Sequence, residues 1–384
     1  MIKIGLASLK IGVPIACNVY DKNGKLLLRK GFVLESPHQV EVLFRDGLYI
    51  KSEPVRTSIA HPRSEPKIEQ ASIPTAISVL TQELKNQENL VRIIRGKTGH
   101  PDIHRLYAAS VHKLITAVQR QRDLCMAYVF FNKTTENYPL RHSLDTAIIA
   151  TIIANSLDKS PYETINIAAA SLTMNISMLK LQEQLVSKAE PLSAEERAKI
   201  NMHPSASATL LKQAGISNDD WLTFVQCHHE KNDWTGYPRG LKGDDIPEGA
   251  QIVCLADRYT ATISPRSYRQ GLVPNVVLRE LLLKHGDTLC LSHAGVLTKV
   301  VGIYPPGMFV KLRNGEIAVV VSSGEDGACP RVKSIIGADN APLPFPISRD
   351  TKKGPLRITA SVRLEPERVP FDMVKIWGEE GGAG

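Results

Sequence analysis

Two adjacent histidines carry the clearest chemical signal in the sequence. His228 and His229 are followed directly by Glu230, and a Gly-Tyr-Pro turn closes the same run at residues 236–238. Imidazole and carboxylate groups together are typical ligands of zinc, iron or manganese. Other parts of the chain supply three more candidate ligands of this kind: His142, His203 and Asp257.

These five candidates must converge from separate elements to act together. They lie on at least four expected helices or helix ends, and convergence inside a helical bundle is how such metal sites form. Neighbouring residues on a helix point about 100° apart, so His228 and His229 reach one site only if that site lies at a helix end or spans two ions. A lone helical histidine is more often a surface or hydrogen-bonded core residue. The residues alone leave a metal site and ordinary histidines as equal alternatives.

The middle of the chain, from about residue 75 to 287, has the apolar spacing of amphipathic helices. Residues 103–131 place apolar side chains at three- and four-residue steps. Ser193 followed by Glu196 is a capping-box signature. Further helices are expected near residues 140–157, 161–187, 193–214, 217–231, 247–263 and 272–285. The pattern predicts a mainly α protein built on a helical bundle.

Strand patterns occupy both ends of the chain. An Asn-Gly turn between two apolar runs predicts a hairpin near residues 19–28, and residues 36–50 suggest a short helix followed by a strand. Residues 53–74 are rich in Pro, Ser and charge, which is typical of a linker. The β-branched run at 295–324 contains Pro-Pro-Gly and Asn-Gly turns and predicts a small antiparallel sheet.

Charge and composition limit the partners. The chain of 384 residues has 47 Lys and Arg against 39 Asp and Glu, a net charge of +8 that favours anionic partners. No dense basic run marks a nucleic-acid surface, so we expect no DNA partner. No apolar run approaches the roughly 20 residues of a membrane span. The six cysteines are scattered without a CxxC pair, which favours a reducing cytoplasm.

The run from His228 to Arg269 closely resembles the signature of the HD-GYP family, bacterial phosphodiesterases of the second messenger cyclic di-GMP. His203 and His142 extend the resemblance upstream, to the His-Pro and His-Ser positions of the family. The resemblance covers about residues 135–290 and implies an all-helical HD-type bundle. The matching residues are His228–Glu230, Asp233, Gly236, Tyr237, Pro238, Gly240, Leu241, Ile246, Pro247, Ala256, Asp257, Arg266 and Arg269. The expected domains are a β-rich N-terminal domain at 1–52, a linker at 53–74, a helical connector at 75–134, the HD-GYP-like domain at 135–290, and a small β module and tail at 291–384.

The resemblance breaks at the His-Asp pair that gives the family its name. Aligning residues 167–179 with the family pattern puts Met174 at the His, Asn175 at the Asp and Met178 at a following Lys. In the family, that Asp bridges two metals. A neutral amide cannot replace a bridging anion, and a thioether is a poor ligand for such ions. Two other positions also depart from the pattern: Trp234 and Thr260.

The resemblance therefore implies a residual site. One metal position retains only His142 and Asp257, whereas the other retains three histidines that could hold a single Fe, Mn or Zn ion. Glu230 and Asp233 would lie outside the ligands and hold the ligands or the Gly-Tyr-Pro turn in place. In the family, the Gly-Tyr-Pro turn borders the nucleotide. Candidate phosphate or partner contacts are Arg239, Arg266 and Arg269.

Three functions follow as alternatives. The favoured one is a degenerate signalling protein that binds cyclic di-GMP, or a partner such as a diguanylate cyclase, without efficient turnover. The second is a residual metal-dependent phosphodiesterase that opens cyclic di-GMP to the linear dinucleotide or GMP. The third is a helical scaffold in which the histidines have no role.

Overall fold

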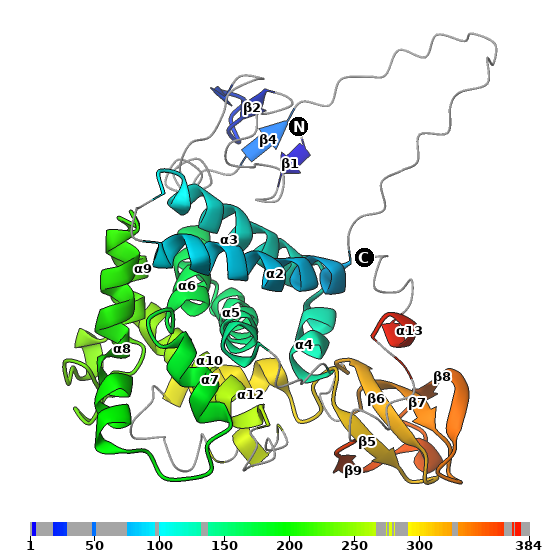
Figure 1. Cartoon of the computed structure of the whole chain (residues 1–384). Coiled ribbons are helices and arrows are strands. Elements are labelled where there is room, and N and C mark those ends of the chain that lie inside the picture. Colours follow the sequence, from blue (N-terminus) through cyan, green and yellow to red (C-terminus); the bar gives the residue numbers. More distant parts are fainter. Residues whose placement is uncertain are drawn as a thin grey trace. The chain divides into compact units, whose positions relative to one another are not determined.

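The helices and strands of this chain form two compact units, residues 1–73 with 160–162 and residues 74–159 with 163–384 (Figure 1). The protein is mainly helical, with a small antiparallel sheet towards each end of the chain, as the sequence predicts. The computed structural model describes residues 2–4, 18–28, 48–50, 75–96, 100–131, 137–265, 274, 276–278, 280, 291–324, 329–364, 371 and 373–377.

The first unit contains a four-stranded antiparallel sheet with strand order β1-β4-β2-β3. Its strands are β1 (Ile2–Ile4), β2 (Val19–Tyr20), β3 (Leu26–Leu28) and β4 (Leu48–Ile50). The predicted Asn-Gly hairpin joins β2 to β3. Asp21 stabilises this turn by accepting the backbone N–H groups of Asn23 and Lys25 at 2.9 and 2.8 Å, and Gly24 takes a positive φ of 83°. The helix expected before β4 and the linker at 53–74 lie outside the described residues.

The second unit is built around one central helix. Its helices are α2 (Ala76–Arg95), α3 (Ile103–Arg120), α4 (Arg122–Phe131), α5 (Tyr138–Ser156), α6 (Pro161–Thr173), α7 (Leu179–Val186), α8 (Ala194–Gln213), α9 (Asp219–Cys227), η2 (Gly243–Asp245), α10 (Glu248–Ile263) and α12 (Leu291–Val301). Every residue of α5 from Tyr138 to Ala154 is buried. A helix that is buried all round must lie in the core.

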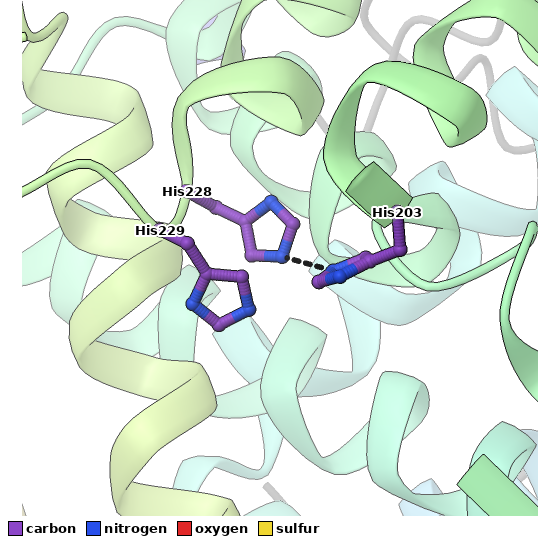
Figure 2. Close-up of side chains that lie close together, drawn as sticks. All are labelled: His203, His228 and His229. Atoms are coloured by element: carbon purple, nitrogen blue, oxygen red, sulfur yellow. Dashed lines mark hydrogen bonds between the residues drawn. The ribbon is translucent and has the colours of Figure 1, made fainter. Parts of the chain in front are cut away.

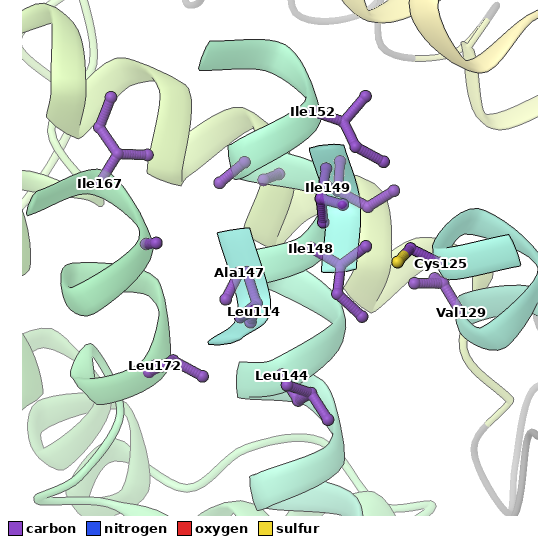
Figure 3. Packing of buried hydrophobic residues seen from close by; sticks show 14 of the residues in the cluster. Leu114, Cys125, Val129, Leu144, Ala147, Ile148, Ile149, Ile152, Ile167 and Leu172 are labelled. Carbon is purple, nitrogen blue, oxygen red and sulfur yellow. The ribbon is translucent and has the colours of Figure 1, made fainter. Parts of the chain in front are cut away.

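The core around α5 is closely packed with aliphatic side chains (Figure 3). Leu144, Ile148 and Ile152 of α5 are at most 1% exposed, and burial of each such side chain contributes about 1.5–3 kcal/mol. Polar residues of α5 are accommodated within the helix, since the Thr146 and Thr151 hydroxyls donate to the carbonyls of His142 and Ala147 at 2.8 and 2.7 Å. The neighbouring elements contribute Leu114, Cys125, Val129, Ile167 and Leu172.

Three expected elements differ in the structure. The helix expected over 103–131 is divided between α3 and α4 at Gln121, whose side-chain oxygen accepts the N–H of Ala76 at 2.6 Å. The helix expected over 161–187 is interrupted between α6 and α7, where the Ser177 N–H donates to Ser207 at 3.2 Å. Residues 295–301 belong to α12 instead of a strand. A β-branched run with buried residues three to four apart fits either period, and here tertiary packing favours the helix.

Capping groups fix the starts of α8 and α9, the two helices that position His203 and His228. At the start of α8, the Ser193 hydroxyl accepts the Glu196 N–H at 3.1 Å, and Glu196 Oε2 accepts the Ser193 N–H at 2.7 Å, so the predicted capping box is confirmed. At the start of α9, Asn218 accepts the N–H of Trp221 at 2.9 Å. The Trp221 indole N–H then donates to Thr173 of α6 at 2.8 Å. These contacts fix α9 against the bundle.

The second sheet has five antiparallel strands in the order β8-β7-β6-β5-β9, which confirms the predicted small sheet after the bundle. An Asn-Gly turn at 314–315 joins β5 to β6, with Gly315 at φ 94°. Glu316 accepts two hydrogen bonds from the Arg349 guanidinium, both at 2.8 Å. The elements are β5 (Phe309–Leu312), β6 (Ile317–Ser322), β7 (Arg331–Ile336), β8 (Pro342–Asp350), η3 (Gly354–Leu356), β9 (Ile358–Val362) and α13 (Met373–Trp377).

Within the part of the chain that the structure describes, no helix is both long enough and apolar enough to cross a bilayer.

Gly249 lets α10 approach α9 closely, so its replacement tests how tightly these two helices pack. A Cβ atom at Gly249 would lie 2.3 Å from the Phe224 ring. We expect Gly249→Ala to lower the free energy of unfolding by about 1–2 kcal/mol, because overpacking costs more than alanine's helix propensity gains. Gly295→Ala in α12 is the control: a Cβ there meets nothing within 4 Å, and the variant should gain about 0.5–1 kcal/mol. Urea unfolding measures both, and a gain at Gly249 would contradict the packing argument.

Candidate metal centre and adjoining cavity

His203 lies in the middle of α8, directly before Pro204. Proline has no N–H, so the carbonyl four residues earlier, that of Ile200, lacks its usual helical donor. The Nδ1–H of His203 donates to this carbonyl at 2.6 Å. The His-Pro sequence therefore supplies both the imidazole and the acceptor that orients it.

His228 is held in the same way at the end of α9, where it forms the C-cap. The last carbonyls of a helix have no partner within the helix, and Val225 O accepts the His228 Nδ1–H at 2.6 Å. In both residues Nε2 is then the nitrogen with the free lone pair. These two Nε2 atoms lie only 3.2 Å apart (Figure 2).

This short separation suits a shared cation. Two neutral imidazoles that both carry the proton on Nδ1 cannot form a hydrogen bond between their Nε2 atoms. Two nitrogen ligands at 2.0–2.1 Å from one tetrahedral ion lie about 3.3–3.4 Å apart. The observed 3.2 Å is close to that value, so His203 and His228 fit adjacent positions on a single ion.

His229 completes a group of three histidines. It follows α9, and its ring lies 4.2 Å from the His228 ring and 5.0 Å from the His203 ring, between centroids. One candidate ligand atom from each of the three histidines lies within 4.8 Å of the others. His228 and His229 can both approach His203 because they lie at the end of α9. A helix end is one of the conditions that the sequence analysis sets for a shared site.

Burial keeps these histidines neutral. It lowers the pKa of His203 to about 3, with a further contribution from nearby His228. Burial likewise lowers the pKa of His228, and places that of His229 well below the ordinary value. A neutral imidazole is the form that ligates a metal. The donor set is thus ready to bind at neutral pH without releasing protons.

His142 and Asp257 form a separate pair between α5 and α10. His142 Nε2 lies 2.7 Å from Asp257 Oδ1, and the Tyr138 ring stacks on the imidazole at 5.6 Å between centroids. Burial alone would raise the pKa of Asp257, but the hydrogen bond with His142 and the neighbouring imidazoles hold it well below its usual range. Thr260 and Thr146 lie behind the pair with their hydroxyl oxygens 2.9 Å apart.

His203 and His229 of the cluster line one cavity of about 470 Å³ together with His142 and Asp257, and this volume is within the range of small-molecule sites. His228 is fully buried. Asn175 and Met178 line the same cavity, whereas Met174 is fully buried in the core. Other wall residues are Tyr138, Gln182, Lys188, Glu190, Leu192, Ile200 and Tyr237. The segment between α6 and α7 therefore lines the same cavity as the histidines.

The Gly-Tyr-Pro turn folds back onto the end of α9. The Glu230 carboxylate accepts the N–H groups of Arg239 and Leu241 at 2.7 and 2.8 Å, and the Tyr237 N–H donates to the carbonyl of His229 at 3.1 Å. A Cβ atom at Gly236 would lie 2.4 Å from the Lys231 nitrogen, so only glycine fits. These contacts place the Tyr237 ring 4.7 Å from that of His229.

The remaining predicted residues lie around this turn or outside the described residues. Asp233 accepts the N–H and hydroxyl of Thr235 at 3.0 and 2.7 Å and so stabilises the turn. Trp234 has a positive φ of 62° and is 62% exposed, with the Lys242 amine 4.9 Å from its ring. Arg239 has an exposed side chain. Arg266 and Arg269 fall outside the described part of the chain.

Several residues of the cavity wall are not predicted from the sequence, among them Tyr138, Gln182 and Lys188. Tyr138 lies one helical turn before His142, a spacing that could have identified it. Gln182 and Lys188 belong to no motif and come from α7 and the segment that follows it. No local pattern marks these two residues, because only the tertiary fold brings them to the histidines.

Comparison with known proteins places this geometry in a family context. Residues 120–288 match the family model of the HD domain. The chain is 26% identical over 198 residues to the cyclic di-GMP phosphodiesterase PdeB of Borreliella burgdorferi, covering 52% of each protein. It is 27% identical over 238 residues to a cyclic di-GMP phosphodiesterase of Pseudomonas aeruginosa, covering 61% of this chain and 56% of the relative.

Residues 120–288 therefore match an HD domain, and the chain is similar to cyclic di-GMP phosphodiesterases at 26–27% identity. It spans about half the length of the curated relatives it matches. A solved HDG"Y"P protein from Bdellovibrio bacteriovorus aligns with a TM-score of 0.48 and 17% identity, over 78% of this chain and 98% of the other. The cluster of His203, His228 and His229 could hold a metal ion.

The three neutral histidines predict a pH-dependent stability of the metal-free protein. As pH falls below about 6.5, the unfolded chain takes up protons that the buried imidazoles of the folded state do not. The free energy of unfolding should therefore decrease on acidification, by up to about 1.4 kcal/mol per pH unit for each imidazole.

Urea unfolding of chelator-treated protein between pH 7.5 and 5.5 measures this effect. The variant with His203→Gln, His228→Gln and His229→Gln should show a flatter dependence, whereas the control His100→Gln, outside the cavity, should keep the original one. An unchanged slope in the triple variant would contradict the assignment.

Proposed function

We propose that this chain is a degenerate HD-GYP protein of cyclic di-GMP signalling that binds the nucleotide in its cavity without efficient turnover. The observation that supports this most directly is Asn175. Its neutral side chain lies in the cavity wall with His142, His203, His229 and Asp257, at the position where the resemblance puts a metal-bridging Asp. Binding of cyclic di-GMP is inferred from the relatives, whose names specify it as their substrate.

The chemistry of hydrolysis explains why turnover should be poor. Two-metal phosphodiester cleavage requires a metal-bound hydroxide and a clamp on the attacking and leaving oxygens. A shared carboxylate lowers the repulsion between the two ions, and an amide carries no charge with which to do so. Asp257, a carboxylate in the same wall, is already paired with His142. A second ion would have to break that pair.

A residual phosphodiesterase is the second candidate, favoured by the three-histidine cluster. Three imidazoles and a water form a workable metal site, and an ion bound there would lower the pKa of the water. In this case Tyr237 and the turn that Glu230 holds would border the substrate. The same turn, with the exposed Trp234, is where we would place contacts to a partner such as a diguanylate cyclase.

One set of measurements separates these candidates. We expect the full chain to bind cyclic di-GMP in calorimetry, to hold at most one metal ion per chain by elemental analysis, and to yield no product above the metal-only control. Turnover that His228→Ala abolishes would favour the residual phosphodiesterase. Absence of both binding and turnover would overturn both candidates, and would favour the scaffold.

A second arm of the experiment tests the role of Asn175. Restoring the family residues with Met174→His and Asn175→Asp, in the background of Met178→Lys, should raise the metal content towards two ions per chain. The matched control is Asn175→Ala, which removes the amide without adding a ligand. A wild-type chain that already holds two ions would contradict the proposed loss of the bridge.

A further inference from the structure

Lys188 is the one lysine or arginine among the described residues that line the cavity. It lies in the segment between α7 and α8, of which residues 188–192 all contribute to the wall. Its side chain is 27% exposed, so solvent and cavity both reach it. No sequence motif draws attention to this residue.

Lys188 is held by a carboxylate that does not line the cavity. Its amine lies 2.7 and 2.6 Å from the two oxygens of Glu196, the residue that closes the capping box of α8. Both side chains are about one quarter exposed, and ion pairs with this much solvent contact are weak. The amine can therefore exchange this partner for another anion at small cost.

The wall of the same cavity also contains two side-chain amides. Asn175 is 4% exposed and its amide lies in the cavity wall. The side-chain oxygen of Gln182, also in the wall, is buried without a partner among the described residues. Buried polar groups in folded proteins nearly always have a hydrogen-bond partner. The Gln182 oxygen therefore indicates a polar ligand in the cavity.

The charge of the cavity makes Lys188 decisive for an anion. Asp257 is paired with His142, and the remaining carboxylate of the wall, Glu190, is exposed. Met178 brings no charge. Among the described residues of the wall, Lys188 is therefore the lysine or arginine side chain that an entering anion meets.

We propose that Lys188 is the phosphate-binding residue of this cavity, exchanging Glu196 for a ligand phosphate while the Asn175 amide donates a second hydrogen bond. The inference rests on the proposed function, since it specifies how the cavity holds a nucleotide. Glu196 then competes with the ligand phosphate for the Lys188 amine, so this carboxylate weakens ligand binding.

This competition predicts opposite effects for the two partners. Lys188→Met should weaken binding about tenfold to a hundredfold, because a charge-assisted hydrogen bond is lost. Glu196→Gln should strengthen binding about two- to fivefold, since glutamine preserves the capping box and releases the amine. In the double variant, Glu196→Gln should have no effect. The control is Lys199→Met, which removes the same charge from an exposed ion pair with Glu195 on α8, outside the cavity.

Calorimetry on the chelator-treated full chain, with thermal unfolding to verify each variant, carries out the test. Cyclic di-GMP, GMP and inorganic phosphate serve as separate probes, so that nucleotide and free phosphate are distinguished. Weakening in both Lys188→Met and Glu196→Gln would indicate a structural role and overturn the inference, as would wild-type affinity in Lys188→Met. Failure of the wild-type chain to bind any probe would overturn the proposed function together with it.

Discussion

The chemistry of the cavity depends on two hydrogen bonds from imidazole to backbone. His203 and His228 each donate Nδ1–H to a carbonyl three residues earlier, at 2.6 Å. Each carbonyl is free for a structural reason, Pro204 in one helix and a helix end in the other. As a result the two Nε2 atoms, each with a free lone pair, lie 3.2 Å from each other. Without a cation between them this approach is unfavourable, so the packing of α8 and α9 must impose it.

That packing comes from the core around α5, which also supplies part of the chemistry. Its buried surface fixes α10, and the two helices together hold the pair of His142 and Asp257. In the interior a polar pair of this kind is stable only when each member is satisfied, and the threonines behind it complete the network. The pair therefore has a structural function whether or not a metal binds nearby.

The sequence predicts the helical bundle, the capping box and both sheets, because these follow from periodicity and from turn residues at fixed spacing. The prediction from sequence is wrong where a helix ends because of contacts with residues far away in the chain. The break at Gln121 depends on the N–H of Ala76, 45 residues away, and the interruption after α6 depends on Ser207. The candidate ligands were recognisable because histidine is rare and its neighbours are distinctive. Lys188 was not, because a lysine in a segment without a motif is ordinary until the fold places it in the cavity.

Binding and hydrolysis place different demands on this cavity. Holding a phosphate group requires fixed positive charge and donors that are present before the ligand arrives, and Lys188 with the Asn175 amide meets that demand at little cost. Hydrolysis requires groups that stabilise charge developing in the transition state. Asp257 is unsuited to accept a proton there, since its pairing with His142 keeps its pKa well below its usual range. A wall that is neutral where a bridging carboxylate would stand therefore favours retention of the nucleotide over its cleavage.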